Sequence, residues 1–385
     1  MQIEAHELTG QAQDQSYVPL PAFSMSGALR AFYEWQHCQP EHDSKLFYSS
    51  AAFGLMQITH EMFSEGSLYD EMHCLNKAIN GQDGTTSHST ALRNLLCSLS
   101  HEAHRSADET IARVILLALQ ASISNFHGPE FWTHMHGLSG VVHDRGTRNL
   151  KTPRAQLLIR VSRTTLLYTQ MYDPKALLFE NRVWRHGLSF EAEYTDMDTL
   201  VGFMASVSIL MRRAAFCGSK HEGVCVVTEA RQVITQMNIW YAKAGDRISW
   251  SVCKQIRKNV KCPLDSFLSF ANPVCAEICL LYHTILLIFA DFLESRTEVV
   301  TFDLARRPPC FDAFTLAYTV TQMVPYFLAG GILGYFTINF PIRFALRSFS
   351  RLEAMEYRQW LLNVVKTSRL ASLDARDIFS EHPQC

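Results

Sequence analysis

The sequence predicts an all-α protein that folds as a multi-helix bundle, and three observations lead to this prediction. Apolar residues recur at helical spacing in long blocks, as they do over residues 111–119. Turn-forming residues separate these blocks, for example at Gly128-Pro129 and at Asp173-Pro174. Because no segment alternates apolar and polar residues between hairpin turns, we expect each block to form a helix.

Composition and charge narrow the class of protein. The chain of 385 residues is 48% hydrophobic and 19% charged, as globular proteins are. Its formal net charge of -2 gives no long-range field that would draw the whole molecule to nucleic acid or to an anionic membrane. The 11 cysteines include no C-x-x-C pair, and the N-terminus has no secretory signal pattern. We therefore expect reduced thiols in an intracellular compartment.

Two parts are expected along the chain. Residues 1–22 are polar and aperiodic and contain Pro19 and Pro21, which is typical of a flexible N-terminal arm. Residues 23–385 show no fixed repeat period of the kind that marks a helical solenoid. We expect them to form a single helical domain.

The clearest helices lie in the first half of this domain. Ser106 and Glu109 have the S-x-x-E spacing of a capping box, so we expect a helix to begin there and to continue as a central core helix. Pro129 suits the first position of the next helix, and Gly146 suits the left-handed position after its last residue. Together these signals predict a tight helical hairpin.

Three further blocks follow along the chain. Pro153 is suited to open a helix, and residues 274–289 form an apolar run that we interpret as a core helix. Residues 313–342 carry no charge, which raises the alternative of a membrane span. Pro325 and the Gly330-Gly331 pair interrupt this run, so the pattern favours two buried helices around a turn.

The region over residues 90–146 carries an ordered series of features. It begins with an amphipathic pattern at residues 90–99, continues with the acidic pair Asp108-Glu109, and leads into the apolar block already described. The next helix then carries a histidine, a glycine three residues later and an Arg-Gly pair, namely His134, Gly137, Arg145 and Gly146. In this order the region resembles the fungal-specific transcription-factor domain, the regulatory domain of zinc-cluster transcription factors.

The resemblance continues more loosely near the C-terminus, where Tyr282-His283 and residues 340–364 are similar to the family's later helices. It implies the all-helical fold of that regulatory domain and a role in transcription in the nucleus. It also implies a structural role for the motif residues, which are Asp108, Glu109, His134, Gly137, Arg145 and Gly146.

Members of this family usually carry a binuclear zinc cluster of closely spaced cysteines ahead of the regulatory domain. Here Cys38 is the only cysteine in the first 70 residues. We therefore expect no specific DNA binding by this chain alone, and a DNA-binding transcription factor or co-regulator as its partner. The expected function is regulation of a fungal secondary-metabolite gene cluster, through protein contacts or by sensing a small-molecule ligand.

The groups of potential metal ligands favour structural roles. Residues two apart on a helix point away from each other, so His134 and His136 are not expected to share an ion. His136 and His143 share a face but lie too far apart along it. Cys275 and Cys279 are four apart in an apolar block, a spacing that fits a metal or two small core residues. We expect no metal site and no cofactor.

Basic residues gather in three groups, and each is a candidate for contact with DNA phosphates. The last of these groups has the spacing of one charged helix face. Aromatic residues are not interleaved with it, as they are in single-strand binders. A solvated face or a protein-contact patch is therefore favoured, and no DNA-binding residue is assigned. The groups are Arg154, Arg160 and Arg163; Arg212 and Arg213; and Lys254, Arg257, Lys258 and Lys261.

The sequence has no G-x-S-x-G elbow, glycine-rich phosphate loop, H-E-x-x-H pair or dinucleotide-binding fingerprint. We therefore expect no catalytic residues. The alternative is a pathway enzyme of the isomerase or cyclase type on the same scaffold, because a pocket can act through its shape. An acid–base pair converging on an apolar cavity would favour this enzyme, whereas an exposed apolar groove would favour the regulator.

Overall fold

The computed structural model describes most of the chain in separate ranges. Within these ranges the chain forms twelve helices and one two-stranded sheet, which confirms the predicted all-α class. The expected arm at residues 1–22 lies outside the described residues. The described ranges are 62, 68–79, 85–124, 129–146, 152–172, 196–245, 248, 250–254, 263–270, 272–294, 312–329 and 331–367.

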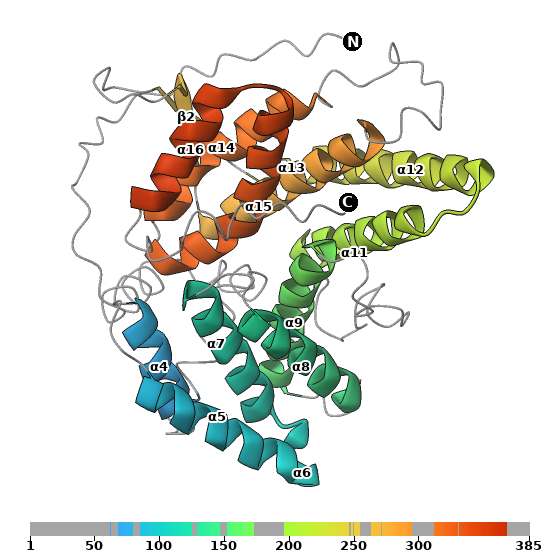
Figure 1. Cartoon of the computed structure of the whole chain (residues 1–385). Coiled ribbons are helices and arrows are strands. Elements are labelled where there is room, and N and C mark those ends of the chain that lie inside the picture. The colour runs from blue at the N-terminus through green and yellow to red at the C-terminus, as the bar shows by residue number, and fades with distance from the viewer. Residues whose placement is uncertain are drawn as a thin grey trace.

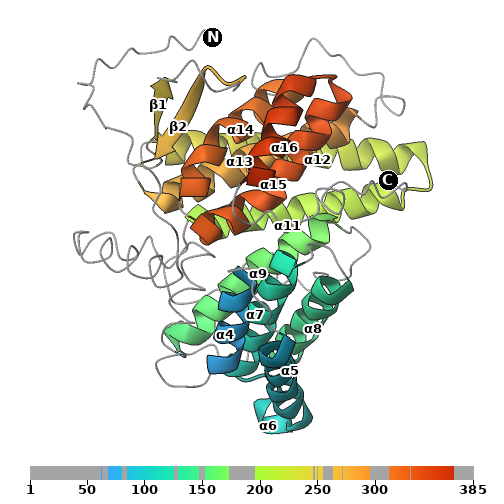
Figure 2. The same ribbon diagram turned by 60° about the vertical axis from the view of Figure 1, so that its left-hand side comes forward.

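Figure 1 and Figure 2 show the helices in two groups, with one long pair between them. The first group contains α4 (Tyr69–Ile79), α5 (Thr85–Ser100), α6 (Glu102–Arg105), α7 (Asp108–Ser124), α8 (Pro129–Arg145) and α9 (Pro153–Tyr172). The second contains α13 (Pro273–Glu294), α14 (Ala313–Ala329), α15 (Gly331–Arg351) and α16 (Met355–Thr367). Between them run α11 (Asp196–Ala215) and α12 (Lys220–Ala244). Because α11 packs on both α9 and α13, it connects the two groups.

Helix α13 is the central helix of the second group. It contacts α11, α12, α14 and α15. By length and hydropathy it is the one helix among the described residues that would be able to cross a membrane, yet 94% of its apolar window in Val274–Glu294 is buried inside the protein. The prediction of a core helix over residues 274–289 is confirmed.

The uncharged run over residues 313–342 forms two helices, as predicted. Helix α14 ends at Ala329, α15 begins at Gly331, and the two pack against each other. Pro325 and Pro341 lie inside these helices rather than at their ends. The two helices are therefore separate elements, as the sequence predicts, and Gly330 between them lies outside the described residues.

The expectation of no strands is wrong at one place. Strands β1 (Trp250–Lys254) and β2 (Ser266–Phe270) pair antiparallel, with Trp250 opposite Phe270. Strand β2 packs on α13 and α14, and its Leu268 and Phe270 are buried. Strands of five residues are too short to give a clear alternating pattern, and their burial comes from contacts distant in sequence.

This sheet also corrects the interpretation of the last basic group. Lys254 lies in β1, so it cannot belong to a charged helix face. Arg257, Lys258 and Lys261 lie outside the described residues.

The capping box lies at a different helix from the one predicted. Ser106 ends α6, and α7 begins at Asp108, with the Ile111 N–H donating to the carbonyl of Ala107. The observed box opens α12, where the Glu222 N–H donates to Ser219 Oγ at 3.2 Å and the Ser219 N–H donates to Glu222 Oε2 at 3.2 Å. The short helix α6 occupies the turn before α7 and places Ser106 at its own end.

Substitution of Ser106 and Ser219 tests which of the two serines caps a helix. Ser219→Ala removes the acceptor for a backbone N–H at the start of α12 and is expected to lower the free energy of unfolding by about 1 kcal/mol. Ser106→Ala is the matched control and should change it by less than about 0.5 kcal/mol. Urea unfolding measures both. Equal losses in the two variants would contradict the assignment.

Candidate functional site

The hairpin of α7 and α8 holds all of the motif residues. The two helices pack against each other, and Nη1 of Arg145 lies 2.6 Å from Oδ1 of Asp108. This ion pair joins the last residue of α8 to the first residue of α7. The Arg145 side chain is 6% exposed and that of Asp108 is 21% exposed, so water screens the pair only in part. Each charge also lies at the helix end whose dipole it complements.

Gly146 ends α8 in the manner that the sequence predicts. Its φ is 57°, and its N–H donates to the carbonyls of Val142 and His143, both at 3.1 Å. A residue with a Cβ is strained in this left-handed conformation, so glycine is the residue that closes the helix without strain.

The other motif residues differ in their surroundings. His134 is buried on α8, and Glu109 is partly buried in the first turn of α7. Gly137 is exposed, and a Cβ built there would meet no heavy atom within 4 Å. Nothing in the described structure explains a glycine at position 137.

The three histidines of α8 lie in different environments, as helical geometry predicts. His134 is 7% exposed, whereas His136 and His143 are exposed to solvent. Burial lowers the pKa of His134; the carboxylate of Glu130 opposes this shift and the imidazole of His88 adds to it. Across the described ranges, no group of three or more His, Cys, Asp or Glu side chains is arranged to hold a metal ion.

One row of contacts was missed by the sequence analysis. Sγ of Cys74 on α4 lies 3.9 Å from Nδ1 of His88 on α5, and Nε2 of His88 lies 3.2 Å from Oε1 of Glu130 on α8. In enzymes with a cysteine nucleophile, an imidazole next to the thiol acts as its base and a carboxylate or similar group orients the imidazole. Cys74, however, is only 1% exposed, and burial raises the pKa of its thiol. The row therefore connects three helices and offers no reachable thiolate.

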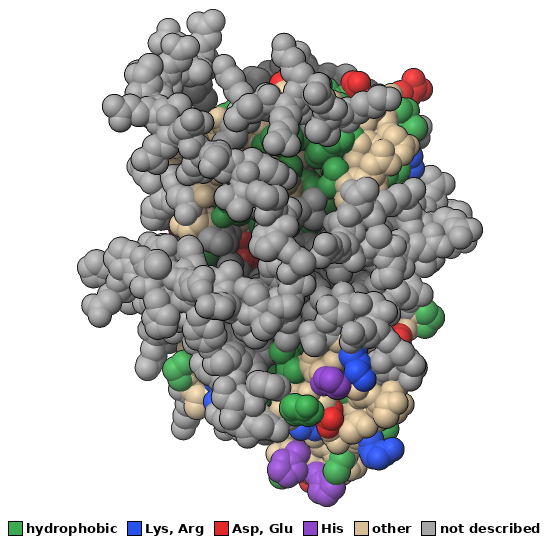
Figure 3. All heavy atoms as spheres, turned by 90° about the vertical axis from the view of Figure 1, so that its left-hand side faces the viewer, with side chains coloured by type: hydrophobic (Ala, Val, Ile, Leu, Met, Phe, Trp, Pro, Cys, Tyr) green, Lys and Arg blue, Asp and Glu red, His purple; other side chains and the backbone are tan. Residues whose placement is uncertain are grey.

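The first two basic groups do not form an open cationic patch. Arg163 is 4% exposed, Nη2 of Arg160 lies 3.3 Å from Oδ2 of Asp198, and Arg213 pairs with Glu229. On the face seen in Figure 3, basic, acidic and histidine side chains of the described residues are interspersed. The pairing of Arg160 and Arg213 with carboxylates is typical of a solvated surface rather than of a nucleic-acid interface.

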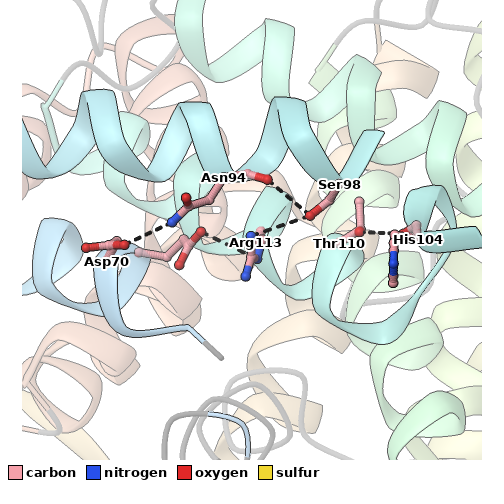
Figure 4. A network of polar contacts seen from close by, with 7 residues as sticks. Asp70, Asn94, Ser98, His104, Thr110 and Arg113 are labelled. Atoms are coloured by element: carbon pink, nitrogen blue, oxygen red, sulfur yellow. Dashed lines mark hydrogen bonds and ion pairs between the residues drawn. The ribbon is translucent and has the colours of Figure 1, made fainter. Parts of the chain in front are cut away.

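A second polar network joins α4, α5 and α7 (Figure 4). The side-chain amide of Asn94 donates to Asp70 Oδ2 at 2.9 Å, and Ser98 Oγ donates to the carbonyl of Asn94 at 3.1 Å. Nη1 of Arg113 donates to Ser98 Oγ at 3.4 Å. Nε of Arg113 lies 3.5 Å from Oε1 of Glu71, whose side chain is 1% exposed. The network fixes how these helices pack.

The Glu71–Arg113 pair is the part of this network that buries a charged carboxylate. At 3.5 Å it is an ion pair without a hydrogen bond. Burial raises the pKa of Glu71, and a backbone hydrogen bond and the guanidinium of Arg113 oppose the rise. Among the described residues, Arg113 is the cation that compensates the charge of this buried carboxylate.

The second candidate site is a cluster of neutral polar groups on α12 and α13, which we call the His283 cluster. Oη of Tyr241 lies 3.4 Å from Sγ of Cys279. Nδ1 of His283 lies 2.7 Å from the carbonyl oxygen of Cys279 and 3.6 Å from its Sγ. The ring of Tyr282 stacks on that of Tyr241 with centroids 3.7 Å apart, and its hydroxyl donates to Asn238 Oδ1 at 2.9 Å.

Burial keeps these groups uncharged at neutral pH. It raises the pKa of Cys279 to about 12 and raises that of Tyr241 further, so both keep their protons. It lowers the pKa of His283 to about 4. The cluster is therefore suited to hydrogen bonding and stacking, and it lacks an ionised nucleophile.

The chain matches no family model, no curated protein and no solved structure in the comparisons made with them. The resemblance to the fungal-specific transcription-factor domain therefore depends on the motif residues and their order in the sequence.

Removal of Arg113 should destabilise the protein, because it leaves the buried carboxylate of Glu71 without its cation. Arg113→Met is expected to lower the free energy of unfolding by about 3 kcal/mol at pH 7. The loss should be smaller at pH 5, because burial raises the pKa of Glu71 and the variant carboxyl, without its cation, is protonated more readily as pH falls. Urea unfolding at both pH values measures this, and Glu71→Gln/Arg113→Met should recover most of the loss. A pH-independent loss that the double variant does not relieve would refute the pairing.

His283 should contribute to acid sensitivity. Its folded pKa of about 4 lies below its ordinary value of 6.5, so the unfolded chain binds more protons between these pH values. Stability therefore falls as pH drops from about 6.5 to about 4, by up to about 3 kcal/mol. His283→Gln should flatten this part of the profile, measured as urea midpoints against pH, whereas His143→Gln on the exposed face should leave it unchanged. Parallel profiles for wild type and His283→Gln would refute this.

Proposed function

We propose that this chain is a transcription regulator of the fungal-specific transcription-factor type, which controls a secondary-metabolite gene cluster from the nucleus. The observation that carries the proposal is the α7–α8 hairpin. It gathers the motif residues into one packed unit, closed by the Asp108–Arg145 ion pair and by the left-handed Gly146. Such an arrangement supports the structural role that the resemblance assigns to Asp108, Arg145 and Gly146.

Protein contacts are the proposed route to DNA. Arg163 is buried, and Arg160 and Arg213 pair with acidic side chains, so these residues contribute little to phosphate binding. With a formal net charge of -2, the chain also lacks the general electrostatic attraction that supplies non-specific affinity. A partner that reads DNA therefore recruits it to promoters.

The enzyme alternative is weakened by the protonation states in the His283 cluster. An isomerase or cyclase of the acid–base kind needs a base whose pKa lies near the working pH. His283, with a pKa of about 4, is a weak base, and Cys279 keeps its proton. Binding of a ligand without chemistry is the use that these groups support best, and it agrees with a sensing role.

Location-controlled complementation tests the proposal. The gene is deleted, and the strain is complemented with the wild-type chain, with the chain fused to a nuclear export signal, or with the chain fused to an inactivated export signal. Transcripts of the neighbouring biosynthetic genes should return with the first and third chains only. A metabolic enzyme would instead restore the product without changing the transcripts.

The DNA step is tested separately with purified components. The chain alone should not shift the promoter fragments of these genes at physiological salt with competitor DNA, because its described residues present no unpaired basic patch and its net charge is -2. Addition of the DNA-binding partner should produce a shifted complex that an antibody to this chain retards further. A specific shift by the chain alone, or normal transcripts in the deletion strain, would refute the proposal.

A further inference from the structure

His283 presents an unused hydrogen-bond acceptor deep in the protein. A carbonyl oxygen only accepts hydrogen bonds, so the 2.7 Å contact with Cys279 requires Nδ1 of His283 to carry the proton. In the neutral ring Nε2 then holds a lone pair. Within the described residues no hydrogen bond engages Nε2, and His283 as a whole residue is partly exposed. The acceptor is therefore fixed in direction and has no hydrogen-bond partner in the described part of the chain.

Aromatic rings lead from the surface to this acceptor. Four aromatic residues are each partly exposed, namely Phe203, Trp240, Tyr241 and His283. Neighbouring centroids are 6.1 Å apart from Phe203 to Trp240, 6.2 Å from Trp240 to Tyr241 and 6.0 Å from Tyr241 to His283. These separations lie within the range of ring–ring contact. A planar apolar body fits such a surface better than a charged or flexible one.

Tyr241 is the natural stacking platform of the cluster. Tyr282 covers one face of its ring at an interplanar angle of 5°, which holds the ring in place. The ring of His283 stands edge-on to Tyr241 at 84°, so a molecule lying along Tyr241 meets the imidazole at its side. A hydroxyl or N–H group at the rim of that molecule can reach a ring nitrogen there.

Charge in the cluster restricts the ligand further. In the described part of the chain, the partners of Tyr241, Cys279 and His283 carry no acidic or basic side chain: they are one another, Tyr282, Trp240, Cys275 and a backbone carbonyl. An ionised ligand would lose its hydration without gaining a countercharge. His283 lies on the central helix α13, which other helices surround. A small molecule reaches such a position more easily than a side chain presented by the flat surface of another protein.

We propose that the His283 cluster binds a neutral, planar aromatic small molecule, which stacks on Tyr241 and donates a hydrogen bond from a hydroxyl or N–H group to Nε2 of His283. The proposal deepens the sensing role and rests on the proposed function for its biological meaning. Binding is measured on the purified chain and regulation through transcripts, so either proposal can fail while the other stands.

Two probes of nearly equal shape test the hydrogen bond. 2-Naphthol has a planar body and a hydroxyl donor, whereas 2-methoxynaphthalene has the same body without a donor. Calorimetric titration of the purified full chain at pH 7 should give an affinity for 2-naphthol at least about tenfold higher than that for 2-methoxynaphthalene. A factor of about ten is the contribution expected of one buried hydrogen bond. Equal affinities, or no heat of binding for either probe up to its solubility limit, would overturn the proposal.

Substitutions then assign the contacts. His283→Phe keeps a ring but removes the acceptor, so the two probes should bind it with equal affinity, near that of the ether for wild type. Tyr241→Ala should weaken both probes in parallel. His143→Phe is the matched control on an exposed helix face and should retain the tenfold preference. A tenfold preference that persists in folded His283→Phe would overturn the proposal; if that variant does not fold, the probe pair on wild type decides alone.

Discussion

The burial of α13 is the constraint on which the rest of the structure depends. An apolar helix whose window is 94% buried must be surrounded on nearly every side, and α11, α12, α14 and α15 supply that cover. The same enclosure removes water from the polar groups that α13 carries. Cys279 and His283 are therefore neutral, and their pKa values of about 12 and about 4 follow from their position in the fold.

Local signals in the sequence were sufficient for much of the fold. Pro129 and Gly146 bound α8 because their preferences act within a single turn. The S-x-x-E spacing occurs at both Ser106 and Ser219, and only the second forms a capping box, because α6 ends at the first. The strand pair was missed, since β1 and β2 owe their state to packing on α13 and α14 rather than to their own pattern.

The candidate site was predictable only in part. Cys279 and His283 are four residues apart on one helix, so their contact could be predicted from their spacing in the sequence. Tyr241 lies 38 residues before Cys279, and Asn238 lies 44 residues before Tyr282, so those contacts depend on how α12 packs on α13. The proton on Nδ1 of His283 follows from a backbone carbonyl, which no pattern of side chains reveals.

The position of α13 along the chain has a consequence for biosynthesis. Helix α11 ends at Ala215 and α13 begins at Pro273, so at translation rates of about 5 to 20 residues per second α11 is made roughly 3 to 12 seconds before the first residue of its central partner. During that interval the faces of α11 and α12 that pack on α13 in the folded protein lack this cover. Nascent chains of this protein are therefore natural clients of ribosome-associated chaperones, and a nonsense mutation before α13 leaves a fragment destined for aggregation or proteolysis.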